Sequence, residues 1–274
     1  MTLVRVDVTT SRGGLLSLPL ADASSGYQVR EIGGLDPVKA TIVTSSFAQQ
    51  DGSMYQSSRR ESRDISFKIG IAPAWATDNV STLRSRLYAF FMPKTAVTLK
   101  FYFADGNYYQ ISGRVESCET SMFSQDQVVD ISVMCFDPDF VDPDTITVSG
   151  STTSGSTVIS LPYNGSVETG VVFTLSLNRA LTQFTIYHQP PDGILRTMEF
   201  SANMLSGDKI EIGTNPGSKY AVLTRANVQS PILYGVSPQS HWVELTPGTN
   251  GIRVYATGAA IPYTIKYTAR YGGL

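Results

Sequence analysis

The chain has 274 residues, of which 42% are hydrophobic and 16% are charged, and its formal net charge is −2. This balance predicts a folded protein with enough length for two domains of ordinary size, and it argues against disorder. A nearly neutral chain is also a poor general partner for nucleic acid or for an anionic membrane surface. No run reaches the roughly 18–20 apolar residues of a membrane span, so we expect no membrane insertion. The first residues lack the apolar stretch of a signal peptide, which predicts synthesis in a host cytoplasm.

Alternating apolar and polar residues predict a mainly β protein. The segments DISFKIGI, VTLKFYF and VVDISVMC in the first half, and GVVFTLSL in the second, each place every other residue on an apolar face. A period of two is typical of strands with one buried face, and of antiparallel sheets that stack in pairs.

A single segment, 77–94, has the spacing of an amphipathic helix. Its apolar stripe consists of Leu83, Leu87, Phe90 and Phe91. We expect Thr77 or Asp78 to cap the start of this helix and Pro93 to end it.

An Asp51-Gly52 pair predicts the turn of a hairpin arm. The returning strand contains Arg59, Arg60 and Arg63, interleaved with acidic residues. These arginines could form a patch for nucleic acid, or belong to an arm that is either solvated or docks on a partner subunit. The interleaved acids, and the lack of accompanying aromatic residues for base stacking, favour the arm.

The turn at 247–250, with the sequence PGTN, separates a strand ending at Leu245 from one starting at Ile252. We interpret it as a terminal hairpin that protects a sheet edge.

Aromatic residues line one face of the last predicted strand, at Tyr263, Tyr267 and Tyr271. An exposed aromatic groove would suit sugar binding, with Trp242, Tyr263 and Tyr267 as the glycan contacts. We favour the other interpretation, in which these tyrosines belong to the core of a sandwich.

Motifs for catalysis or metal binding are missing from the sequence. His188 and His241 lie far apart and neither has a cysteine at metal-ligand spacing, which argues against zinc. A hydrolase triad can assemble from any sequence order, but no nucleophile motif, P-loop or dinucleotide fingerprint occurs. We interpret Cys118 and Cys135 as small buried residues rather than as a disulfide or a nucleophile. We therefore expect no enzyme activity, no metal and no cofactor.

The segment 136–157 interrupts the strand pattern with Asp-Pro turns and a Gly/Ser/Thr run. It predicts a first domain at 1–142, a linker at 143–149 and a second domain at 150–274.

The order of these features resembles the distal tail proteins, often called Dit, of phages with long, non-contractile tails. In the first half the resemblance is carried by YQVREIGGLDPVKATI, by the arm AQQDGSMYQSSRRESRDISFKIGI and by VDISVMCFDPDF. In the second half it is carried by LSGDKIEIGT, HWVELTPGTNGIRVYATG and YTIKYTARYGG. The resemblance implies an N-terminal β-sandwich-like domain with one helix and an extended hairpin arm, followed by a C-terminal galectin-like jelly-roll sandwich.

The resemblance also implies a function, that of a structural hub at the distal end of the virion tail. A hexameric ring of N-terminal domains would join the tail tube protein to the tail-tip or tail-associated lysin protein. It would take part in host adsorption, in many phages by carrying receptor-binding proteins, and DNA would pass through it without specific binding. The candidate contacts between copies are Asp51, Gly52, Tyr55, Arg59, Arg60 and Arg63. The alternative function is a carbohydrate-binding module that recognises host surface glycans through the second domain.

Overall fold

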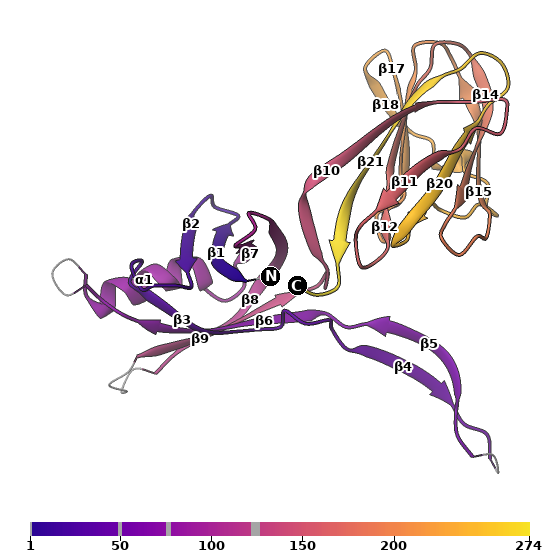
Figure 1. Ribbon diagram of the computed structural model, residues 1–274. Helices are drawn as coiled ribbons and strands as arrows, with labels where there is room; N and C mark the ends of the chain where they lie inside the picture. Colours follow the sequence, from indigo (N-terminus) through magenta and orange to yellow (C-terminus); the bar gives the residue numbers. More distant parts are fainter. Residues whose placement is uncertain (1, 49–50, 75–77, 122–126) are drawn as a thin grey trace. The chain divides into compact units, whose positions relative to one another are not determined.

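The chain divides into two compact units in its computed structural model (Figure 1). The structure describes residues 2–48, 51–74, 78–121 and 127–274. Unit 1 contains Met1–Pro143 and Tyr271–Leu274, and unit 2 contains Asp144–Arg270. The expected linker at 143–149 instead lies within one long strand, β10, most of whose residues are exposed or half-buried. Polar, turn-forming residues can occupy such a strand because few of its side chains enter a core.

Two sheets that share strand β8 build unit 1. One sheet has the order β3-β6-β9-β8 and the other β8-β7-β1-β2, with antiparallel neighbours throughout. Strand β8 pairs with β7 up to Arg114 and with β9 from Arg114 onwards, and a bulge lies between Val115 and Ser117. Because a bulge bends a strand, the two halves of β8 can belong to sheets that fold over one core. The bounds are β1 Leu3–Thr10, β2 Leu15–Pro19, β3 Tyr27–Gly33, β4 Ala40–Ser45, β5 Met54–Arg60, β6 Arg63–Ile71, α1 Val80–Phe91, β7 Ala96–Phe103, β8 Tyr108–Thr120, β9 Val128–Cys135 and β10 Phe140–Ser151.

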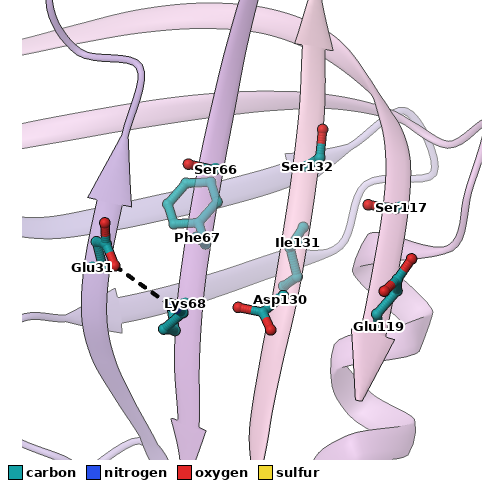
Figure 2. A pocket seen from close by; sticks show the side chains of 9 residues that line it. All are labelled: Glu31, Ser66, Phe67, Lys68, Ser117, Glu119, Asp130, Ile131 and Ser132. Atoms are coloured by element: carbon teal, nitrogen blue, oxygen red, sulfur yellow. Dashed lines mark ion pairs between the residues drawn. The ribbon is translucent and has the colours of Figure 1, made fainter. Parts of the chain in front are cut away.

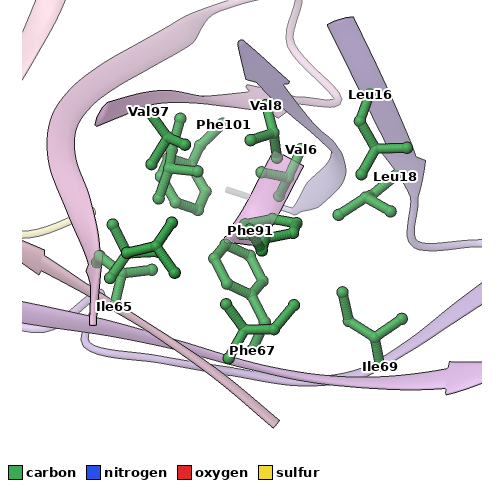
Figure 3. Packing of buried hydrophobic residues seen from close by; sticks show 14 of the residues in the cluster. Val6, Val8, Leu16, Leu18, Ile65, Phe67, Ile69, Phe91, Val97 and Phe101 are labelled. Carbon is green, nitrogen blue, oxygen red and sulfur yellow. The ribbon is translucent and has the colours of Figure 1, made fainter. Parts of the chain in front are cut away.

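The alternating apolar residues of both sheets meet in one core against α1. Val6 of β1, Phe67 of β6 and Phe101 of β7 are buried there, together with Phe91 of the helix (Figure 3). The predicted inward residues of β6, β7 and β9 are confirmed as buried, except for Ile71, which is half-buried.

The predicted helix is confirmed as α1, but its cap differs from the expected one. Asn79 caps it, since its side-chain oxygen accepts a hydrogen bond from the Thr82 backbone N–H at 2.8 Å. Asp78 precedes the cap, and Thr77 lies outside the described residues. Asp and Asn are comparable caps, so composition alone does not choose between neighbours. The buried residues of the helix are Leu83, Leu87 and Phe91, and Phe90 is half-buried beside them. Over the described part of the chain, no helix is long and apolar enough to cross a membrane.

Unit 2 is a sandwich of two antiparallel sheets, as predicted. One has the order β18-β17-β16-β13-β21-β10 and the other β11-β20-β14-β15, and a short pair joins β12 to β19. Phe173 and Ile265 of the first sheet, and Phe184 and Ile252 of the second, are buried. The bounds are β11 Ile159–Tyr163, β12 Thr169–Gly170, β13 Val172–Ser176, β14 Leu181–Gln189, β15 Arg196–Met204, β16 Lys209–Gly213, β17 Tyr220–Arg225, β18 Val228–Pro231, the 3-10 turn η1 Leu233–Gly235, β19 Glu244–Leu245, β20 Gly248–Tyr255 and β21 Pro262–Tyr271.

The expected terminal hairpin is wrong. Strand β19 pairs with β12, while β20 pairs with β11 and β14, so the strands on either side of the PGTN turn belong to different sheets. The side chain of Asn250 takes the place of cross-strand backbone bonds. It donates to the carbonyls of Thr246 and Gly248 and accepts from the Thr246 N–H. A buried asparagine can close a turn in this way without a paired strand.

Candidate functional site

Strands β4 and β5 form a two-stranded sheet of their own, the predicted hairpin arm (Figure 1). Its pairing runs from Ala40 opposite Arg60 to Ser45 opposite Met54, and its residues are exposed except for the half-buried Ser45. A hairpin of two strands is marginally stable in water when nothing covers it. The arm therefore needs support from elsewhere.

Large apolar side chains are exposed on the arm in an unusual concentration. Those of Ile42 and Tyr55 are each 62% exposed. The others are Val43, Phe47 and Met54. Towards its tip, Phe47 and Met54 line a hollow of about 270 Å³ together with Asp51, Gly52 and Ser53. Grouped apolar side chains of this kind mark interaction surfaces.

Four of the six predicted contact residues lie on this arm with exposed side chains or backbone. Asp51 and Gly52 lie at its tip, where Gly52 adopts a φ of 91° that favours glycine. Tyr55 and Arg59 are exposed residues of β5. These four remain candidates for contact with another molecule.

Arg60, by contrast, is paired within its own chain. It is the last residue of β5, and its guanidinium binds both carboxylate oxygens of Asp139, one of them at 3.0 Å. The Asp139 carboxylate is almost fully buried. A two-point contact of this geometry is the strongest form of arginine–carboxylate pair, so Arg60 ties the end of the arm to the turn that carries Asp139.

Arg63 is not a surface residue at all, and its predicted role as an interface contact is wrong. It is 1% exposed, and its guanidinium lies 4.5 Å from the centre of the Phe140 ring. The guanidinium donates to four backbone carbonyl oxygens, those of Gly34, Asp36, Pro138 and Gly272. Burial lowers the pKa of Arg63, but the carbonyl dipoles replace much of the lost water.

A second surface lies on the outer face of the β3-β6-β9-β8 sheet, where carboxylates gather (Figure 2). A hollow of about 330 Å³ there is lined by Glu31, Lys68, Glu119 and Asp130 among others, and Lys68 pairs with Glu31 at 3.7 Å. None of the exposed large apolar side chains of the described residues lies on these four strands. Sequence reasoning missed this face because each strand supplies only one or two acids, and pairing alone brings them together.

The two tyrosines considered as glycan contacts point into the core of unit 2. Tyr263 and Tyr267 are 3% and 4% exposed, and burial raises the pKa of Tyr263 to about 12. The Tyr267 hydroxyl donates to the Pro162 carbonyl at 3.2 Å. Trp242 is half-buried, with the Lys219 ammonium 5.4 Å from its ring centre. The preferred core interpretation thus fits Tyr263 and Tyr267, whereas Tyr271 is half-buried and belongs to unit 1.

The thiols and the buried histidine are structural residues. Cys118 and Cys135 are both free, and burial raises their pKa values to about 11 and about 12. His188 is buried, with its Nε2 3.1 Å from the Asn250 amide oxygen, and desolvation lowers its pKa. Among the described residues, no group of three or more His, Cys, Asp or Glu side chains could hold a metal ion.

Comparison with known proteins gives a family match for the second half of the chain. Residues 164–271 match the family model described as siphovirus-type tail component, C-terminal domain. No curated protein sequence matches the chain.

Solved structures also resemble this chain over nearly its whole length. The crystal structure of the Dit protein of phage SPP1, described as a paradigm of the hub adsorption apparatus in phages that infect Gram-positive bacteria, matches with a TM-score of 0.67. The identity is 15%, over 97% of this chain and 98% of that one. A chain of the phage P2 baseplate in its activated conformation with Ca matches with a TM-score of 0.50 and 10% identity, over 98% and 99% of the two chains. The predicted resemblance is confirmed, since residues 164–271 match the model of a siphovirus-type tail component C-terminal domain and the fold of the whole chain is similar to that of the SPP1 Dit protein.

Proposed function

We propose that this chain is the structural hub at the distal end of a long, non-contractile phage tail. Copies close into a hexameric ring that joins the tail tube protein to the tail-tip or tail-associated lysin protein, and that can carry receptor-binding proteins. The family match of residues 164–271 and the Dit fold support a role in the tail.

The exposed arm is the observation that best supports the proposed ring. Its apolar side chains are exposed in the single chain, and β4 and β5 pair only with each other among the described strands. Interface cores are enriched in Tyr, Phe and Met, which the arm supplies at Tyr55, Phe47 and Met54. A surface that docks on a different surface of the next copy makes a head-to-tail contact, and such contacts generate closed rings. The arm therefore suits docking on a second copy.

The outer face of the β3-β6-β9-β8 sheet, the acidic face, is polar where the arm is apolar, and it suits a surface along which DNA passes. Asp, Glu and Ser are depleted at the centre of protein interfaces, so a face that carries Glu31, Glu119, Asp130 and Ser66 is poorly suited to burial against protein. In a ring that DNA crosses, carboxylates on the channel wall would repel the phosphates and prevent the binding that lysines and arginines would cause. We place this face on the channel.

The test is the native mass by light scattering, followed by negative-stain imaging. We expect a closed ring for the wild-type chain and a large loss of assembly for Ile42→Asp. The matched control is Leu15→Asp, because Leu15 is 59% exposed on β2, outside the arm. A wild-type chain that stays monomeric alone and with tail tube protein would contradict the hub. A ring that forms equally well with Ile42→Asp would contradict docking through the arm.

A further inference from the structure

The arm is joined to the rest of unit 1 by two short segments, 34–39 and 61–62, neither of which is a strand. Changes in direction of a chain are absorbed at such connections between elements. The direction of the arm therefore depends on what holds these two segments.

Segment 34–39, which leads into the arm, is held from two sides. Arg63 binds the carbonyls of Gly34 and Asp36, and between them the Leu274 N–H donates to the Leu35 carbonyl at 3.0 Å. Gly273 lies so close to Pro37 that an added Cβ would fall 2.8 Å from the Pro37 ring. The last residues of the chain thus lie directly against the root of the arm.

Segment 61–62, which leads back from the arm, is held at both of its ends. Arg60 binds Asp139 through two nitrogen–oxygen contacts, and the Glu61 N–H donates to the Lys39 carbonyl at 3.0 Å. The turn that carries Asp139 is fixed in its own place, because Arg63 also binds the carbonyl of Pro138 at 2.6 Å. Both connections of the arm therefore meet at one cluster of hydrogen bonds around Arg63.

We infer that Arg60 and Arg63, with the C-terminal residues Gly272–Leu274, form a clamp that positions the arm before a second copy docks on it. The clamp lies within unit 1, and only its purpose rests on the proposed ring. An arm held in one direction loses less conformational freedom on docking than a free one, which strengthens assembly without adding any contact. Arg60 and Arg63 are positioning residues in this scheme and touch no partner.

The position of the arm can be measured directly with two spin labels. We would place them at Ser57→Cys on β5 and Ser11→Cys on the body, both exposed sites, in a Cys118→Ser background. Pulsed electron–electron double resonance would measure the distance between the labels at dilutions where light scattering shows a monomer. The same measurement would be repeated in an Ile42→Asp background. We expect one narrow distance distribution for the parent chain.

Arg60→Gln should broaden that distribution at least twofold and raise the concentration needed for assembly at least tenfold. Arg60→Lys keeps the charge but not the two-point contact, so an intermediate width is expected. The matched control for the distance distribution is Arg59→Gln, which removes the same charge from the exposed neighbouring residue and should leave the width unchanged. A truncation that ends the chain at Tyr271 tests the other side of the clamp and should also broaden the distribution.

The outcomes distinguish a clamp from a purely structural role of the same residues. They also distinguish a failure of the clamp from a failure of the proposed ring. Hydrogen exchange of α1 peptides reports whether unit 1 remains folded. If Arg60→Gln speeds that exchange but leaves the distance distribution narrow, the pair is merely structural and the clamp is refuted. If the parent chain never forms a ring but Arg60→Gln broadens the distribution, the clamp stands and the proposed ring fails. An unchanged width in both Arg60→Gln and the truncated chain would overturn the inference.

Discussion

Replacing Arg63 with methionine should be among the most destabilising single changes in unit 1. The substitution retains most of the side-chain length but removes every donor to the carbonyls of Gly34, Asp36, Pro138 and Gly272. Four lost hydrogen bonds at about 1 kcal/mol each amount to about 4 kcal/mol. The variant no longer buries a charge, which offsets part of this loss. We expect a net loss of about 3 kcal/mol, which is roughly a hundredfold change in the unfolding equilibrium.

Hydrogen exchange with mass spectrometry suits this prediction, because the chain has two units and a single melting curve would mix them. Amides of β6 and β9 should exchange roughly a hundred times faster in Arg63→Met, while those of β14 and β20 in unit 2 serve as an internal reference. Arg59→Met is the matched control and should leave both sets unchanged, since Arg59 is exposed. If Arg63→Met left β6 and β9 within about threefold of wild type, the four carbonyl contacts would contribute no net stability, and the reasoning would be refuted.

Three further predictions concern the remaining polar and aromatic core residues. Burial lowers the pKa of His188 in the folded chain, while the unfolded chain takes up the proton near pH 6.5. The contribution of His188 to the stability of unit 2 should therefore be constant above about pH 6.5 and fall as the pH drops below it. The fall should be weaker in His188→Gln, and melting temperatures measured from pH 8 to pH 5 would show the difference. Tyr267→Phe removes the bond to Pro162 and should destabilise unit 2 by about 1 kcal/mol in urea, and a glycan array should give the same result for variant and wild type. Cys118 and Cys135, whose pKa values are raised to about 11 and 12, should react with a thiol reagent at pH 7.5 far more slowly than free cysteine until urea is added.

Strands and their inward faces could be predicted from the sequence because the responsible pattern is local. A period of two identifies the buried residues of β6, β7 and β9 without any knowledge of their partners. Helix α1 follows in the same way from its apolar stripe. Its cap is Asn79 rather than the expected Thr77 or Asp78, and residue type could not show this because Asp and Asn accept the same backbone bond.

Neither the partners of the strands nor the burial of the arginines could be predicted, because both depend on residues far away in the chain. The PGTN turn has the composition of a hairpin, yet β20 finds its neighbours in β11 and β14. Arg59, Arg60 and Arg63 belong to one short motif but have three different environments. Groups far away in the chain decide which arginine is paired or buried. Among them are the carboxylate of Asp139 and the carbonyl of Gly272, 209 residues beyond Arg63.

The two surfaces of unit 1 constrain each other if the ring forms. An apolar arm must be covered by protein, whereas a face with Glu31, Glu119 and Asp130 must keep its water, because burying carboxylates against apolar side chains costs several kcal/mol for each charge. Any packing of copies that buries the arm against the acidic face would therefore pay that desolvation cost while giving the arm no apolar partner. The surface that receives the arm must lie elsewhere on the neighbouring copy, and the acidic face is left open. An open acidic wall in every copy is the arrangement that DNA can cross without being held.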